Sequence, residues 1–129
     1  MIYDTVILIE DDHIIRYGFK SLMNNFFSTQ ELLMFENGED GLEHLDNLDI
    51  EHFNKKTILF LDLNMPLVDG WCFLEKFKEK FPSLEEHISI YILSSSINKE
   101  NIIKLKENKL VSGFIHKPIT LDELRALIT

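Results

Sequence analysis

The sequence predicts an α/β fold in which five parallel strands form one sheet and helices cover both of its faces, a (βα)5 doubly wound arrangement. Five short apolar runs of strand length recur along the chain, and segments with apolar residues at helical spacing separate them. The runs are nearly continuous in apolar residues, as is typical of strands buried on both faces. Right-handed crossovers between parallel strands place the connecting helices on both faces of the sheet.

Each predicted strand is rich in β-branched, aromatic or other apolar residues, which favour the extended conformation. The five runs are Thr5–Ile9, Glu31–Phe35, Thr57–Leu61, Ser89–Leu93 and Gly113–Ile115. Strand and helix therefore alternate five times along the chain.

The segments between the strands are predicted to be amphipathic helices, because their apolar residues recur at helical spacing. In the first helix these residues are Ile14, Ile15, Phe19, Leu22 and Met23. In the third helix the pattern, with charges interleaved, runs through Trp71, Leu74, Phe77, Lys78 and Phe81.

Helix boundaries are marked by residues with a known effect on the backbone. Pro82 is predicted to end the third helix, and Thr120 with Glu123 forms the pattern of a capping box that begins the fifth. Helical spacing fades over Asp46–Lys56, which indicates a longer connection before the third strand.

Length and composition indicate one globular domain, residues 1–129, of ordinary hydrophobic content. Acidic residues outnumber basic ones 22 to 13, and the formal charge of −9 argues against direct nucleic-acid binding by this chain. The single cysteine, Cys72, excludes an internal disulfide. The N-terminus lacks the pattern of a signal peptide and no apolar run is long enough to cross a bilayer, so we expect a cytoplasmic protein without membrane contact.

Polar residues gather directly after four of the predicted strands. In open parallel sheets the ligand site lies beyond the carboxyl ends of the strands, so these residues are expected at one edge. They are Glu10, Asp11 and Asp12, then Asp62 and Asn64, then Ser94, Ser95 and Ser96, then His116 and Lys117.

The chemistry of this set indicates a magnesium site and a phosphoryl acceptor. Carboxylates brought together repel one another unless a hard cation neutralises them, and Mg²⁺ takes one or two carboxylates with water and phosphate. Asp62 can then act as a nucleophile toward phosphorus and form an aspartyl phosphate. Ser94 and Lys117 offer a hydroxyl donor and a counter-charge to the phosphoryl oxygens.

Four segments, VILIEDD, LFLDLNMPLVDG, YILSSS and FIHKPI, resemble in this order the signature segments of the response-regulator receiver family. The resemblance spans essentially the whole chain and implies the flavodoxin-like receiver fold. By position, it implies that Glu10 and Asp11 are the acidic metal pair, Asp62 the phosphoacceptor, and Asn64 the donor of a backbone carbonyl to the metal. Asp12 matches no ligand position and is expected to cap a helix.

The resemblance also assigns residues to the switch that follows phosphorylation. Ser94 and Lys117 correspond to the family's switch hydroxyl and its lysine, and Phe114 corresponds to the aromatic side chain that turns inward. The Lys117-Pro118 bond stands where the family typically has a cis bond. Asn64 and Ser96 stand at the positions that tune dephosphorylation, and since neither is acidic we expect no strong activation of water there.

The function that the resemblance implies is a Mg²⁺-dependent switch rather than an enzyme acting on external substrates. The phosphodonor would be a sensor histidine kinase or a phosphotransfer protein, and the chain would catalyse only its own phosphorylation and autodephosphorylation. The fourth helix, fifth strand and fifth helix, including Lys99–Asn108 and Leu121–Thr129, would meet an unknown downstream protein. Homodimerisation on phosphorylation is a further expectation. Both a stand-alone regulator and an excised receiver fit the sequence.

Each motif taken alone has a purely structural interpretation. Acidic residues favour helix N-termini, Asp-x-Asn-x-Pro favours a turn, serines cap helices, and a lysine before proline can be solvated. The five histidines show no metal-ligand spacing, and Trp71 and Cys72 look structural. The functional interpretation is favoured because the segments occur together and in order.

Three rival functions are weighed against the switch. A magnesium phosphatase of the strand-end aspartate class needs a second aspartate two residues on, where this chain has Asn64. A flavin or nucleotide domain needs a phosphate-binding loop after the first strand, where Glu10, Asp11 and Asp12 would repel phosphate. A degenerate receiver that only binds proteins would lack functional residue types that are all present here.

Overall fold

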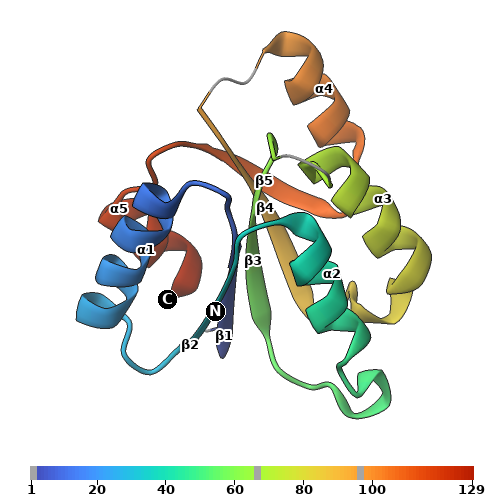
Figure 1. The fold of residues 1–129 in the computed structure, drawn as a ribbon, viewed down its shortest axis with the longest axis horizontal. Coiled ribbons are helices and arrows are strands. Elements are labelled where there is room, and N and C mark those ends of the chain that lie inside the picture. The colour runs from blue at the N-terminus through green and yellow to red at the C-terminus, as the bar shows by residue number, and fades with distance from the viewer. Residues whose placement is uncertain (1–2, 66–67, 96–97) are drawn as a thin grey trace.

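A computed structural model describes residues 3–65, 68–95 and 98–129, and its centre is one parallel five-stranded sheet in the order β2-β1-β3-β4-β5 (Figure 1). The predicted fold class is confirmed. The strands are β1 Thr5–Ile9, β2 Glu31–Phe35, β3 Thr57–Asp62, β4 Ile88–Ser94 and β5 Val111–His116.

Helices cover both faces of the sheet, as the strand pattern predicted (Figure 1). The helix bounds are α1 His13–Phe26, α2 Gly38–Asp46, α3 Gly70–Lys80, α4 Lys99–Glu107 and α5 Leu121–Ile128. Buried side chains of α1 and α5 belong to one core cluster, and those of α2, α3 and α4 belong to the other. The two clusters are separated by the sheet.

Strand β1 explains why the apolar runs are continuous. All five of its residues are buried, with Val6 and Leu8 in the cluster beneath α1 and α5, and Ile7 and Ile9 in the cluster beneath α2 and α3. Successive strand residues point to opposite faces, so a strand with helices on both sides needs apolar residues at every position.

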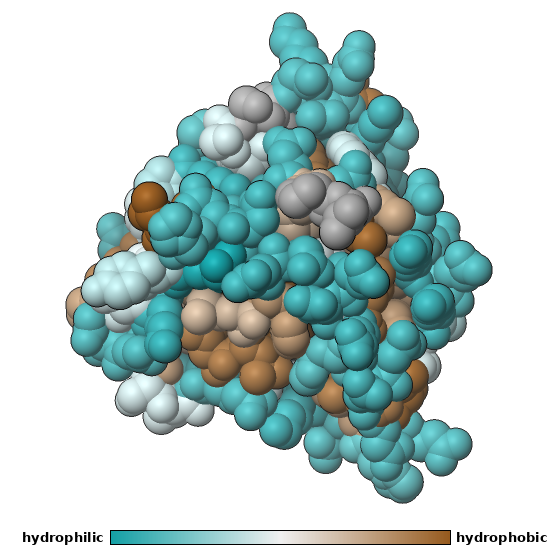
Figure 2. Space-filling view, in the orientation of Figure 1, coloured by the Kyte–Doolittle hydropathy of each residue, from teal (hydrophilic) through white to brown (hydrophobic). Residues whose placement is uncertain are grey.

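The edge strand β2 is less covered. Four of its five residues are only half-buried, and Figure 2 shows apolar side chains gathered over the part of this face where β2 and α2 lie. β2 is an edge because the chain runs outward from β1 to β2 and then returns to place β3 on the other side of β1. This reversal leaves the carboxyl ends of β1 and β3 adjacent, where a doubly wound sheet places its ligand site.

The predicted helix boundaries are confirmed. Asp12, Asn37, Asp69 and Asn98 each accept a hydrogen bond from a backbone N–H in the first turn of the helix they cap, and the capping box of Thr120 with Glu123 is formed. Helix α3 ends at Lys80, just before Pro82, which opens the short 3-10 helix Pro82–Leu84. The connection after α2 is long and contains the 3-10 helix Ile50–His52.

The structure corrects the predicted apolar face of α1 and the start of the fifth strand. Phe19 and Met23 are buried, but Ile14 is 69% exposed, because neighbouring Ile14 and Ile15 point about 100° apart on a helix and only one can face the sheet. The fifth strand begins at Val111, two residues before the predicted start, because Ser112 and Gly113 interrupt the apolar run without ending the strand.

Candidate functional site

Three carboxylates meet where β1 and β3 end. Glu10 follows β1, Asp62 is the last residue of β3, and the two strands pair in register with Ile9 opposite Leu61. Carboxylate oxygens of Glu10, Asp11 and Asp62 all lie within 4.8 Å of one another, the one such group among the described residues. Glu10 and Asp62 are 0% and 2% exposed, whereas Asp11 is exposed. The site is therefore a buried acidic pair with one acid open to solvent.

Lys117 enters the same site from the end of β5. Its Nζ lies 2.8 Å from Glu10 Oε2 and 3.1 Å from Asp62 Oδ1. Its backbone N–H donates to the carbonyl of Ser94 at 3.0 Å, and the following bond to Pro118 is cis, as the resemblance implied. Lys117 thus bridges the two buried carboxylates.

The protonation of Asp62 reflects this crowding. Burial and, after it, the negative charge of Glu10 raise the pKa of Asp62 from 3.8 to about 7, because Lys117 offsets only part of their effect. Burial by itself lowers the pKa of Lys117, but its hydrogen bonds to Glu10 and Asp62 outweigh burial and raise that pKa overall. The ammonium group therefore stays charged, while the Asp62 carboxylate needs more positive charge near it to ionise fully.

The residues present fit a divalent cation. Three carboxylates face a single ammonium group, and buried Glu10 Oε2 has the Lys117 Nζ as its partner at 2.8 Å. Asp11 faces the solvent side, where a Mg²⁺ ion that keeps several waters would be held. A hollow of about 500 Å³ opens over the cluster and is lined by Glu10, Asp11, Asp12, Ile15, Asp62, Asn64, Ser95, Lys117 and Pro118.

A family model described as a response regulator receiver domain matches residues 6–129. The chain belongs to this family. It is therefore a receiver domain of the kind found in two-component systems, in which receivers generally use Mg²⁺ at an acidic pocket and pair with histidine kinases and downstream effectors.

Similar proteins of known sequence and structure agree with this assignment. The nitrate/nitrite response regulator protein NarL of Escherichia coli (strain K12) is 29% identical over 93% of this chain and 50% of its own length. Hybrid signal transduction histidine kinase H of Dictyostelium discoideum is 23% identical over 95% of this chain and 8% of its own. The chain thus spans half or less of these relatives. A two-component response regulator from Cytophaga hutchinsonii superposes with a TM-score of 0.86 at 25% identity, covering 98% of this chain and 94% of that one.

Of the remaining predicted residues, two lie at the acidic site, one lies outside the described residues and one does not join the cluster. Buried Ser94 ends β4, whose residue Leu93 pairs with Asp62 across the sheet, so Ser94 lies beside the acidic cluster. Asn64 lines the hollow, and its backbone N–H donates to Asp62 Oδ1 at 3.2 Å. Ser96 lies outside the described residues. His116 is exposed and its Nδ1 contacts the carbonyl of Lys117, so it does not join the acidic cluster.

Phe114 lies on the face of the sheet that carries α4, and a bulge puts it there. Ile90 pairs with Val111 but Tyr91 pairs with Gly113, so Ser112 is an extra residue in β5. The bulge reverses the alternation of the strand. Phe114 consequently pairs with Ile92, which packs beneath α3 and α4, and its side chain is 37% exposed.

Ser95, which was expected at this edge without an assigned role, lines the hollow. One residue near the site, Arg16, was not singled out from the sequence. Arg16 donates from Nη1 to the carbonyl of Glu10 at 2.8 Å. The only signal for Arg16 was a basic residue six positions after the first acid, and a spacing of that kind does not reveal a bond to the backbone.

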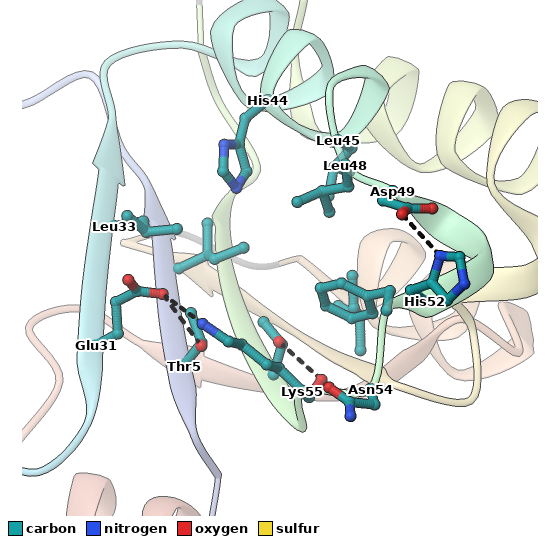
Figure 3. A pocket seen from close by; sticks show the side chains of 14 residues that line it. Thr5, Glu31, Leu33, His44, Leu45, Leu48, Asp49, His52, Asn54 and Lys55 are labelled. Atoms are coloured by element: carbon teal, nitrogen blue, oxygen red, sulfur yellow. Dashed lines mark hydrogen bonds and ion pairs between the residues drawn. The ribbon is translucent and has the colours of Figure 1, made fainter.

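A second cavity, of about 340 Å³, lies at the opposite edge of the sheet, near the amino ends of β1, β2 and β3 (Figure 3). Its walls include Leu33, His44, Leu48 and Phe53. Lys55 in its wall pairs with Glu31 at 3.7 Å, and Nδ1 of His52 contacts an Asp49 carboxylate oxygen at 2.8 Å. It contains none of the predicted site residues.

No described helix is both long and apolar enough to span a membrane.

Proposed function

We propose that this receiver domain is a Mg²⁺-dependent phosphorylation switch whose acceptor is Asp62. The supporting observation is the arrangement at the ends of β1 and β3. The Asp62 carboxylate is buried beside Glu10 and Asp11 and lies 3.1 Å from the Lys117 ammonium group. A nucleophile, a candidate metal site and a cation for the phosphoryl oxygens are therefore within one small volume.

The residues divide the work of phosphoryl transfer. Glu10, Asp11, Asp62 and the backbone carbonyl of Asn64 would hold Mg²⁺, which supplies positive charge to the phosphoryl oxygens. An oxygen of the Asp62 carboxylate forms a bond to phosphorus as the bond from phosphorus to the donor histidine breaks, and the departing imidazole nitrogen takes up a proton from solvent water. Lys117 and Ser94 then hold the oxygens of the aspartyl phosphate.

The new phosphoryl group would be read out through β4 and β5. It brings roughly 1.5 to 2 negative charges to the sheet edge. Ser94 would move onto it, and Phe114, now half-exposed beside α4, would turn inward. Phe114 has no phenolic hydroxyl, so burial of its ring is the driving force. The surface that changes is formed by α4, β5 and α5.

Return to the resting state would be slow autodephosphorylation. Asn64 and Ser96 stand at the tuning positions and neither can act as a base toward water, so we expect a long-lived phosphoryl group. We further propose that residues 1–129 form a single receiver unit in the cytoplasm, phosphorylated by a histidine kinase or phosphotransfer protein, and acting on a protein partner rather than on nucleic acid.

The test is intact-mass spectrometry after incubation with Mg²⁺ and acetyl phosphate. We expect wild type to gain the mass of one phosphoryl group, and Asp62→Asn or a sample with EDTA to gain none. Asp69→Asn is the matched control, because Asp69 lies in the same connection but caps α3, a task that asparagine also performs. It should be modified like wild type.

A domain that only binds proteins would give a different result. In that case no adduct forms on wild type at any Mg²⁺ concentration, and the proposed switch is wrong. An adduct that forms on Asp62→Asn would also contradict the assignment of the acceptor. Continuous release of phosphate from a phosphoester substrate would favour the phosphatase alternative, against which the presence of Asn64 argues.

A further inference from the structure

Arg16 joins three segments that meet at the acidic site. It lies at the end of the first turn of α1 and reaches back to the end of β1, where Nη1 donates to the carbonyl of Glu10 at 2.8 Å. Its Nη2 lies 3.6 Å from Oε1 of Glu36, in the connection between β2 and α2. The Arg16 side chain is largely buried, whereas Glu36 is largely exposed.

The carbonyl of Glu10 needs such a partner. Glu10 comes directly after the last residue of β1 and is fully buried, so solvent does not reach it. Buried backbone carbonyls are nearly always paired, and one without a partner shifts toward another donor. Arg16 supplies the donor, and the bond holds the peptide unit between Glu10 and Asp11.

Every other polar group of Glu10 is also held. Its N–H donates to the carbonyl of Phe35 at 3.0 Å, its Oε1 accepts from the N–H of Asp12 at 3.2 Å, and its Oε2 pairs with Lys117 at 2.8 Å. Arg16 therefore completes a set of contacts that holds both the backbone and the carboxylate of this residue in place.

We infer that Arg16 is a positioning residue that keeps Glu10 and Asp11 in the geometry needed to bind Mg²⁺. This inference rests on the proposed metal site. A partner of this kind, which orients metal ligands without touching the metal, is typically important for metal affinity. The direction in which Mg²⁺ affinity changes on loss of Arg16 distinguishes positioning from a simple effect of charge. Removal of a cation beside three carboxylates would tighten Mg²⁺ binding if charge alone mattered, whereas loss of orientation weakens it.

The test measures Mg²⁺ binding by isothermal titration calorimetry, without a phosphodonor. Arg16→Met keeps much of the aliphatic stem and removes the guanidinium, and we expect its Kd for Mg²⁺ to rise roughly tenfold. Arg16→Lys keeps the charge but loses the fork that bonds the carbonyl, and its Kd should rise by about threefold. Glu36→Gln is the matched control at the exposed end of the same pair and should stay within about twofold of wild type.

Phosphorylation by acetyl phosphate provides a second readout. In Arg16→Met the Mg²⁺ concentration for half-maximal rate should shift with the Kd, while the rate at saturating Mg²⁺ stays within about twofold of wild type. A general loss of folding would instead lower the modified fraction at all Mg²⁺ concentrations. Thermal unfolding in EDTA monitors folding, and if Arg16→Met does not fold, Arg16→Lys carries the test.

The outcomes separate this inference from the proposed function. If wild type binds Mg²⁺ and is phosphorylated, but folded Arg16→Met binds Mg²⁺ as tightly or more tightly, the positioning role is overturned and the switch stands. Unchanged Mg²⁺ affinity in Arg16→Lys, where Arg16→Met does not fold, would also overturn it. If wild type binds no Mg²⁺ at all, the proposed metal site fails and the role of Arg16 fails with it.

Discussion

Asp62 occupies a position that disfavours its own charge. It is buried beside Glu10, and the ion pair with Lys117 offsets only part of the resulting penalty. Groups that bind a ligand or react are often held in such environments, because the ligand then supplies the missing charge. The folded protein therefore loses stability where Asp62 is ionised, and cation binding or loss of the carboxylate would restore it.

The pH dependence of stability follows from the pKa of Asp62. The folded state keeps this proton up to about pH 7, whereas the unfolded chain loses it near 3.8. Between these values the folded state binds more protons, so the contribution of this group to stability falls as pH rises, and the full penalty is present above pH 7. Asp62→Asn should therefore raise the Tm in metal-free buffer, by roughly 5 °C at pH 8 and by roughly half that or less at pH 5.

The measurement is thermal unfolding by circular dichroism in EDTA at both pH values. Asp69→Asn serves as the control, since it removes the same formal charge from a half-buried capping position. A Tm of Asp62→Asn that equals or falls below that of wild type at pH 8 would show that the pair with Lys117 outweighs burial.

At the scale of single elements, the start of α3 is pressed against the end of β3. A Cβ on Gly70 would lie 2.8 Å from Leu63 Cα and 2.9 Å from the carbonyl oxygen of Asp62, and both are backbone atoms that cannot turn aside. The same addition at Gly18, on the exposed side of α1, would meet no atom within 4 Å. An added methyl group would therefore clash with the backbone at Gly70 but fit without contact at Gly18.

Matched alanine substitutions should change stability in opposite directions. Gly70→Ala forces α3 away from β3 and should lower the free energy of unfolding by about 2 kcal/mol. Gly18→Ala relieves only the entropic cost of glycine inside a helix and should raise it by about 0.5 to 1 kcal/mol. Urea unfolding checks both, and equal midpoints for Gly70→Ala and wild type would mean that the close approach is not rigid.

Among the five α-helices of the described chain, α4 has the fewest buried residues. Only Leu105 of this helix is buried. The helix also contacts α3 through Lys104, whose Nζ lies 5.8 Å from the centre of the Trp71 ring. Elements with few buried contacts open at low free energy. This property suits a helix that belongs to the surface expected to change on phosphorylation.

Truncation of the buried α4 residue should release this helix selectively. Leu105→Ala should lower the free energy of unfolding by about 2 to 3 kcal/mol and speed amide exchange across Lys99–Glu107 more than in β1 or β3. Ile103→Ala, which changes an exposed side chain of the same helix, should stay within about 0.5 kcal/mol of wild type. Equal acceleration of exchange in all elements of Leu105→Ala would show that α4 opens only with the whole domain.

At the scale of the whole molecule, charge and exposed apolar groups oppose each other. The formal charge of −9 disfavours association of two copies. Ile103 and Phe114, on α4 and β5, are the exposed large apolar residues of the surface expected to change. A switch at this surface can therefore alter a balance between repulsion and apolar contact.

We predict a monomer that dimerises on phosphorylation. Sedimentation equilibrium should give a mass near 15.2 kDa without a phosphodonor and a rise toward twice that value with Mg²⁺ and acetyl phosphate. Asp62→Asn under the same conditions controls for effects of the salt and should stay monomeric. A phosphorylated protein that keeps the monomer mass would contradict the dimer while leaving the phosphorylation chemistry intact.

The sequence by itself determined the elements of this receiver and the residue types at its functional edge. Apolar periodicity placed the strands within about two residues, and the residues after each run named the acids and Lys117. These signals are local, because side chains on one face recur every second residue in a strand and every third to fourth residue in a helix.

Only the tertiary structure decided how these residues combine. The register between β1 and β3 brought Glu10 and Asp62 together, the pairing of β5 with β4 placed Lys117 against both, and packing of α1 brought Arg16 to a backbone carbonyl. A single extra residue in β5 put Phe114 on the face of α4. Such outcomes depend on contacts between distant segments. A one-residue shift in strand pairing moves side chains to the opposite face of the sheet, but the sequence of the strand is the same in both cases.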